Sequence, residues 1–130
     1  MDQQLHSAGY QLDSQTGVFQ NPDFVGIRYS DGDETELRIE AIIQNASDLS
    51  TFSPQLKLHC TDWASTYHLS SLRSNILRPF EFSAGQDILE IGAGCGAITR
   101  YLGEAGANVL ALEGSSRRSR MARSRTRDLS

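Results

Sequence analysis

The chain has 130 residues and a formal net charge of −4, and hydrophobic residues make up 38% of it. This length suits one ordinary domain, or two small units at most. No apolar run approaches the roughly 20 residues that cross a membrane, and the N-terminus lacks the apolar stretch of a signal peptide. Cys60 and Cys95 stand far apart in unlike settings. We therefore expect a cytoplasmic protein with reduced thiols, no membrane partner and no metal site.

Charge is distributed unevenly along the chain. Residues 1–116 carry 15 acidic and six basic side chains, whereas residues 117–130 carry six arginines and one aspartate. An arginine-rich end can bind RNA, but this one has no interleaved aromatic residues and follows an acidic chain. We favour a solvated helix face with Met121 and Ala122 turned inward, together with Leu129, and we do not expect a nucleic-acid partner.

The first 84 residues predict a mostly helical segment. Residues 1–32 are weakly patterned, with short extended stretches expected at 17–19 and 24–29. Asp33 and Glu36 fit the capping box of a helix, whose inward stripe at i, i+3, i+4 and i+7 would be Ile39, Ile42, Ile43 and Ala46. A second short helix is expected from Pro54 to about Cys60.

A bend and a third helix are expected between residues 63 and 79. Trp63, Tyr67 and His68 would lie in the bend, with Trp63 as a core anchor and His68 as a structural histidine. The helix would begin after Ser70 or Ser71 and stop at Pro79. Its inward-facing residues would be Leu72, Ile76 and Leu77.

After residue 85, strand and helix signals alternate. An apolar strand at 88–91, expected to be covered on both faces, leads into the turn Gly92-Ala93-Gly94-Cys95-Gly96. An amphipathic helix follows, and Gly106 fits its C-cap. A second apolar strand spans 109–112, and Ser115 or Ser116 would cap the arginine-rich helix. Right-handed crossover makes the two strands neighbours in a doubly wound parallel sheet.

The glycines and two acids suggest the ligand. A ligand at the end of the first strand passes close to the backbone, which glycine allows, and the helix N-terminus offers N–H groups. Residues 92–97 also match the GxGxxA dinucleotide fingerprint. Glu90 opposes a pyrophosphate but suits an ammonium group. Glu113 suits the hydroxyls of a ribose, which NAD also carries.

The stretch EIGAGCG, followed by a helix and VLALEG, resembles the first two nucleotide-binding segments of class I S-adenosylmethionine-dependent methyltransferases. Their acid–x–Gly–x–Gly–x–Gly motif is filled by Glu90, Gly92, Gly94 and Gly96, and their acid after the second strand by Glu113. The upstream DWASTYHLSSLRSNILRPF is similar to the lead-in of bacterial methyltransferases that occur alone or fused to glycosyltransferases. The resemblance covers about a third of the chain.

This resemblance implies S-adenosylmethionine as the cofactor. Glu90 would reach the methionine ammonium through water, and Glu113 would bind the ribose hydroxyls. Ala93 and Cys95 would contribute backbone, with Cys95 a small turn residue rather than a nucleophile. The remaining cofactor-binding residues would be Gly92, Gly94 and Gly96 along the methionine and ribose, and Tyr67 and His68 near the methionine end.

The resemblance also implies that much of a methyltransferase domain is missing, since the family has seven strands and two are recognisable here. We expect residues 1–84 to be a helical lead-in and residues 85–130 to be the truncated first half of a Rossmann-like domain, inactive alone and with an unknown catalytic residue. The intact protein would methylate a small-molecule or glycan acceptor.

Two exposed sheet edges predict a homodimer, or extra strands from residues 15–30. Two functional alternatives stay open. One is a dinucleotide-binding oxidoreductase fragment, and the other is a non-catalytic interaction module.

Overall fold

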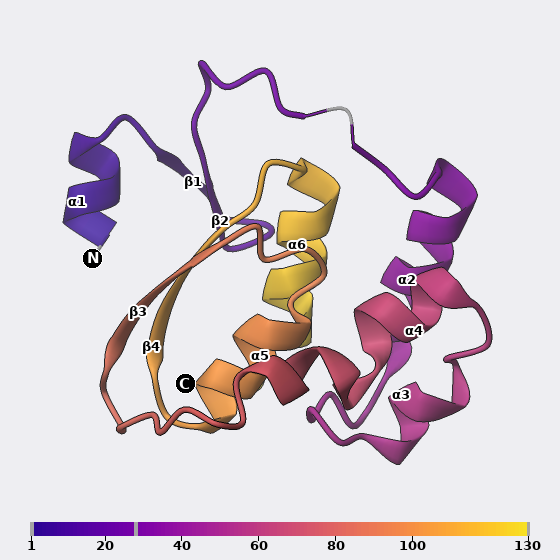
Figure 1. Cartoon of the computed structure of the whole chain (residues 1–130). Coiled ribbons are helices and arrows are strands. Elements are labelled where there is room, and N and C mark those ends of the chain that lie inside the picture. Colours follow the sequence, from indigo (N-terminus) through magenta and orange to yellow (C-terminus); the bar gives the residue numbers. More distant parts are fainter. Residues whose placement is uncertain (1, 28, 130) are drawn as a thin grey trace.

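The computed structural model describes residues 2–27 and 29–129. The fold is mixed α/β, and the described part contains two sheets of two strands each (Figure 1). The elements in chain order are α1 (Asp2–Ser7), β1 (Gln11–Asp13), β2 (Val18–Gln20), α2 (Asp33–Asn45), α3 (Pro54–Leu58), α4 (Trp63–Leu69), the 3-10 helix η1 (Ser71–Ile76), β3 (Asp87–Ile91), α5 (Ala97–Glu104), β4 (Asn108–Leu112) and α6 (Ser116–Arg125). Within the described ranges, every helix is too short or too polar to cross a membrane.

The N-terminal strands form a hairpin of their own. β1 and β2 pair antiparallel, with Gln11 opposite Gln20; β2 confirms part of the predicted extended stretch, whereas α1 and β1 were not expected. The stretch expected at 24–29 forms no strand at 24–27, and its Arg28 lies outside the described residues. The expected extra strand therefore pairs within the hairpin and leaves the parallel sheet at two strands in the described chain.

Helix α2 has the predicted buried stripe but a different N-terminus. Ile39 and Ile43 are fully buried. Gly32 is the N-cap, and no side chain caps the helix, so the expected Asp33–Glu36 capping box is wrong. The physical reason is that the helix begins one residue earlier than expected, so that the Glu36 N–H donates to the Gly32 carbonyl at 3.0 Å and not to the Asp33 side chain. The Glu36 carboxylate is 4% exposed and accepts hydrogen bonds from Nε of Arg118 at 3.0 Å and from the Asp31 N–H at 3.4 Å.

Residues 63–69 form helix α4 instead of the expected bend. Asp62 caps it, since Oδ1 accepts from the Ser65 N–H at 2.8 Å while the Ser65 hydroxyl accepts from the Asp62 N–H at 3.1 Å. Trp63 was expected in the core but is 67% exposed. It stacks on Tyr67 of the next turn, with ring centroids 5.0 Å apart.

The helix expected after Ser70 is the 3-10 helix η1. Ser70 does cap it, with its hydroxyl accepting from the Leu72 N–H. The prediction that Leu72 and Ile76 face inward is wrong, because they are 63% and 69% exposed. The tighter 3-10 winding changes which residues share a face. The helix ends at Ile76, ahead of Pro79.

β3, α5, β4 and α6 follow in the predicted order. β3 and β4 are parallel, with Asp87 opposite Asn108 and Ile91 opposite Leu112. α5 packs against this sheet. The other face is open, since Leu89 and Ile91 are 57% and 79% exposed, so the expectation of a strand covered on both faces is wrong in this chain.

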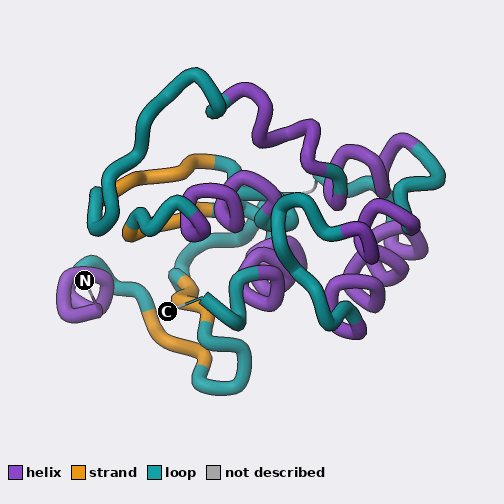
Figure 2. Tube along the Cα trace, turned by 90° about the horizontal axis from the view of Figure 1, so that it is seen from below, coloured by secondary structure: helices purple, strands orange, loops and turns teal. Residues whose placement is uncertain are grey.

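The buried core lies mainly among the helices. In Figure 1, α5 and α6 stand between the parallel sheet on one side and α2, α3 and α4 on the other. Figure 2, seen from below, shows the strands on one side together with the N-terminal helix α1, and most other helices on the opposite side. Helix α6 contacts α2, α5 and β2. The core cluster consists of Ile39, Ile43, Ala46, Leu49, Leu56, Leu69, Cys95 and Met121. The glycine turn is thus anchored to the helical half through Cys95.

The arginine-rich helix α6 is only partly solvated. Met121 and Ala122 are buried as predicted, at 1% and 6% exposure. Arg118 and Arg125 are also buried, at 6% and 1%, which corrects the expectation of a solvated arginine face. The guanidinium of Arg125 donates to the carbonyls of His68 and Leu69, so α6 fastens α4 to the rest of the protein.

Candidate functional site

The candidate site is the glycine turn, residues 92–96, which joins β3 to α5. Gly92, Gly94 and Gly96 all have positive φ angles, of 78°, 58° and 82°, a conformation that L side chains rarely adopt. The N–H groups of Gly92 and Ala93 both donate to the Leu112 carbonyl, at 2.8 and 3.1 Å. The turn is therefore fixed on the carboxyl end of β4 as well as β3.

The three glycines face different surroundings. A Cβ added at Gly92 or Gly94 would meet no atom within 4 Å, whereas one at Gly96 would lie 2.7 Å from Cα of Ala122. Gly96 thus permits close packing of the turn on α6. Gly92 and Gly94 leave their backbone open, which is what a ligand passing along the turn requires.

Glu113 connects the end of β4 to the glycine turn. Its Oε2 accepts a 2.7 Å hydrogen bond from the Gly94 N–H, and its Oε1 accepts one of 2.8 Å from the Ser115 N–H. A carboxylate has about four acceptor positions, so two remain for hydroxyl donors. Glu113 is half-buried, which keeps it within reach of a ligand at the turn.

Glu90, the acid that precedes the glycine turn, is half-buried near the end of β3. Its Oε2 accepts a 2.6 Å hydrogen bond from the hydroxyl of Thr99, in the first turn of α5. Burial raises the pKa of Glu90 above its usual 4.5, and the nearby Glu113 charge raises it further, while the Thr99 bond opposes both. A cationic group beside Glu90 would offset this cost, because an opposite charge favours the ionised carboxylate.

Ala93 and Cys95 are the buried members of the turn, at 7% and 2% exposure. Sγ of Cys95 lies 3.9 Å from Sδ of Met121. Burial raises the pKa of the Cys95 thiol to about 12, so the thiol stays protonated near neutral pH. A protonated, enclosed thiol is a poor nucleophile, in keeping with a packing role.

His68 and Tyr67 have different partners from those expected. His68 is 3% exposed, and its Nε2 lies 2.7 Å from Oδ2 of Asp31. Tyr67 is 37% exposed and stacks between Trp63 and the guanidinium of Arg73, whose Cζ is 4.1 Å from the ring centroid. Among the described residues, no hydrogen bond links either side chain to the glycine turn, so their placement near the methionine end stays a prediction.

His68 belongs to a buried ionic network that sequence reasoning missed. Asp31 Oδ2 also accepts a 2.8 Å hydrogen bond from Arg118, which in turn binds Glu36. Thr99, which holds Glu90, was missed as well, and Ser115 was expected only as a helix cap and not as the donor of an N–H bond to Glu113. The available signal was the placement of Thr99 in the first turn after the glycines and of Ser115 two residues after Glu113.

Across residues 2–27 and 29–129, no group of three or more His, Cys, Asp or Glu side chains is arranged to hold a metal ion.

Comparisons with protein-family models, with curated proteins and with solved structures gave no significant match. Function therefore has to be argued from the residues at the glycine turn.

Proposed function

We propose that this chain is the N-terminal part of a class I S-adenosylmethionine-dependent methyltransferase, and that the glycine turn binds the cofactor. On this proposal β3, α5, β4 and α6 are the first half of a Rossmann-like domain, and residues before them form its helical lead-in. The observation that carries the proposal is the convergence of Glu90 and Glu113, from the ends of two adjacent parallel strands, on a glycine turn whose backbone is open at Gly92 and Gly94.

The two carboxylates would hold opposite parts of the ligand. Glu113 would keep its bonds to Gly94 and Ser115 and use its free acceptor positions for the ribose hydroxyls. Glu90 would face the methionine ammonium, directly or through water, and its raised pKa marks a buried carboxylate that a cation would stabilise.

One of the two acids, Glu90, argues against a dinucleotide. A pyrophosphate at the turn would approach Glu90, and like charges in a partly buried site repel strongly. Glu113 does not discriminate, since NAD carries ribose hydroxyls too. Glu90 is therefore the residue that favours S-adenosylmethionine.

Methyl transfer makes modest demands on the protein. The bound cofactor would supply a methyl group already activated by its sulfonium. The protein would align an acceptor in line with the departing sulfur and exclude water. We propose a small-molecule or glycan acceptor in the intact protein; no described residue is assigned as the catalytic base.

The test is a calorimetric titration of S-adenosylhomocysteine and, separately, of NAD into the chain. We expect S-adenosylhomocysteine to bind selectively. In a Glu113→Ala variant its affinity should fall by at least about tenfold, because hydrogen bonds to charged groups contribute roughly 1.5–3 kcal/mol.

Glu81→Ala is the matched control, since Glu81 is an exposed acid outside the turn. Its affinity for S-adenosylhomocysteine should equal that of the parent chain. Circular dichroism of each variant separates a lost ligand contact from a lost fold. Selective binding of NAD, or no binding of either ligand by the folded chain, would contradict the proposal.

A further inference from the structure

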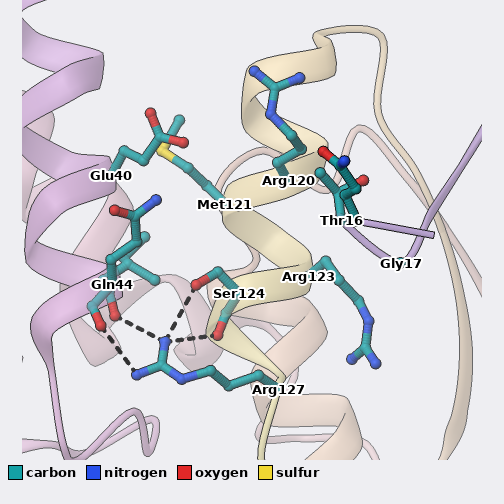
Figure 3. Close-up of a pocket in the computed structure, with 11 residues that line it drawn as sticks. Thr16, Gly17, Glu40, Gln44, Arg120, Met121, Arg123, Ser124 and Arg127 are labelled. Carbon is teal, nitrogen blue, oxygen red and sulfur yellow. Dashed lines mark hydrogen bonds between the residues drawn. The ribbon is translucent and has the colours of Figure 1, made fainter. Parts of the chain in front are cut away.

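A second candidate site lies between the N-terminal hairpin and the helical half. An open cavity of about 550 Å³ is bordered by the hairpin turn at residues 15–17, by α2 and by α6 (Figure 3). Its lining includes no residue of the glycine turn. The volume falls in the range of about 300–1,000 Å³ that small-molecule sites occupy.

The cavity has an apolar floor and polar walls. Ile43 and Met121 lie at the base of the cavity, where they are almost fully covered by their neighbours at 0% and 1% exposure. Glu40 and Gln44 line the α2 side, and Thr16 lines the hairpin side (Figure 3). A rigid floor with hydrogen-bonding groups on both sides suits a ligand that is itself polar at both ends.

Three arginines line the cavity: Arg120 and Arg123 of α6, and Arg127, which follows α6 and is held by hydrogen bonds to the end of α2. Arg127 donates to the carbonyls of Ile43, Gln44 and Ala46 and so closes the end of α2. Arg120 and Arg123 differ, because neither forms an ion pair or side-chain hydrogen bond with any residue in the described part of the chain.

Arg123 is held beside the hairpin turn. Gly17 has a φ of 68°, and a Cβ there would lie 3.3 Å from Nε of Arg123. The turn thus lets the arginine side chain pass close to its backbone. Arg120 lies one helical turn earlier, and neither guanidinium group forms an ion pair among the described residues, although Asp13 is close enough to Arg120 for their charges to interact. The two side chains border the hairpin side of the cavity and point toward opposite ends of α6 (Figure 3).

We propose that this cavity binds a small phosphate ester of a polyol, such as a sugar phosphate. Guanidinium groups match phosphate geometry with paired hydrogen bonds, so the phosphate would lie beside Arg123 on the hairpin side, and Arg120 would turn its side chain toward the same phosphate. Glu40 repels an anion on the α2 side but accepts hydrogen bonds from hydroxyls, and Gln44 can donate or accept them. The sugar end would therefore lie across α6, against Glu40 and Gln44.

The test uses glucose 6-phosphate, glucose and inorganic phosphate as calorimetric probes of the whole chain at one fixed ionic strength. Glucose 6-phosphate should bind more tightly than either of the other two. Arg120→Ala and Arg123→Ala should each weaken its binding by about tenfold or more. Arg78→Ala, which removes an exposed arginine outside the cavity, should leave the affinity unchanged.

A Glu40→Gln variant tests the sugar end. It should reduce the preference for glucose 6-phosphate over inorganic phosphate, because a neutral amide repels free phosphate less and accepts hydroxyl hydrogen bonds more weakly. Thermal unfolding of each variant checks that the fold is retained. The proposal is overturned if inorganic phosphate binds as tightly as the ester, if folded arginine variants keep full affinity, or if none of the probes binds.

Discussion

The backbone N–H of Gly94 donates a 2.7 Å hydrogen bond to Oε2 of Glu113, 19 residues later in the chain. This bond joins the turn after β3 to the residue that follows β4. Glu113 thereby holds the glycine turn in place, and the turn holds the Glu113 carboxylate in the position where it would bind a ligand. Such mutual positioning reduces the ordering that a ligand would have to impose.

The glycines of the turn should differ sharply in their tolerance of alanine. Gly96→Ala should destabilise the fold by about 2–4 kcal/mol, because its Cβ would meet Ala122 at 2.7 Å in addition to the strain of a positive φ. In Gly92→Ala the new Cβ would have no atom within 4 Å, so the substitution should lower the free energy of unfolding by only about 1–2 kcal/mol, through backbone strain. Urea unfolding of the two variants measures the difference, and equal losses would contradict the packing role assigned to Gly96.

The ionised Glu90 side chain should lower the stability of the fold and raise the affinity for the ligand. Its pKa lies above 4.5 in the folded state, so its ionisation costs more there than in the unfolded chain, and stability is lost as the pH rises through the window just above 4.5. A Glu90→Gln variant should melt a few degrees higher at pH 7 and bind S-adenosylhomocysteine more weakly. Glu81→Gln, at an exposed position, should do neither. A Glu90→Gln variant that melts lower at pH 7 would contradict this account.

His68 should make the protein less stable in mild acid. Burial lowers its pKa below 6.5 in spite of Asp31, so the folded state favours the neutral ring, and stability is lost as the pH falls below 6.5. A His68→Gln variant should show a smaller loss of unfolding free energy between pH 7 and pH 5. His59→Gln, which changes an exposed histidine, should keep the parent's pH dependence. Parallel pH profiles for the His68 variant and the parent would refute the assignment.

Arg125 should be the arginine whose loss costs most stability. It is 1% exposed and donates to the carbonyls of His68 and Leu69. Arg125→Ala leaves a cavity and two carbonyls without donors, which should cost about 2–4 kcal/mol. Arg123→Ala, at an exposed position of the same helix, should stay within about 0.5 kcal/mol. Chemical unfolding compares them, and similar costs would show that Arg125 does not fasten α4.

Local signals predicted the segment from β3 to α6 well. Gly106 follows the C-cap of α5 with a φ of 84°, and Ser115 caps α6 through the Arg118 N–H. Each of these features depends on residues close in the chain, so a single sequence contains the required information. The same holds for Ser53, whose hydroxyl accepts from the Leu56 N–H at the start of α3.

Features that depend on distant residues could not be predicted. Glu36 fits a capping box locally, but its carboxylate is buried by an ion pair with Arg118, 82 residues later, which the local pattern does not reveal. Trp63 has the size and polarity of a core residue, yet it is 67% exposed, because the fold brings no distant element over its side chain at the start of α4 in the described chain. At the candidate site, the motif residues could be named from the sequence, whereas the Gly94–Glu113 and Thr99–Glu90 bonds required the fold.

The central claim is that the glycine turn binds S-adenosylmethionine, and the most direct measurement follows its amides by nuclear magnetic resonance. In a chain labelled with ¹⁵N-glycine, which contains 11 glycines, S-adenosylhomocysteine should shift the signals of Gly92, Gly94 and Gly96 and leave those of Gly9 and Gly32 in place. The shifts should saturate with added ligand and be absent in Glu113→Ala. Unchanged turn signals at saturating ligand, or the same shifts with NAD alone, would contradict the account.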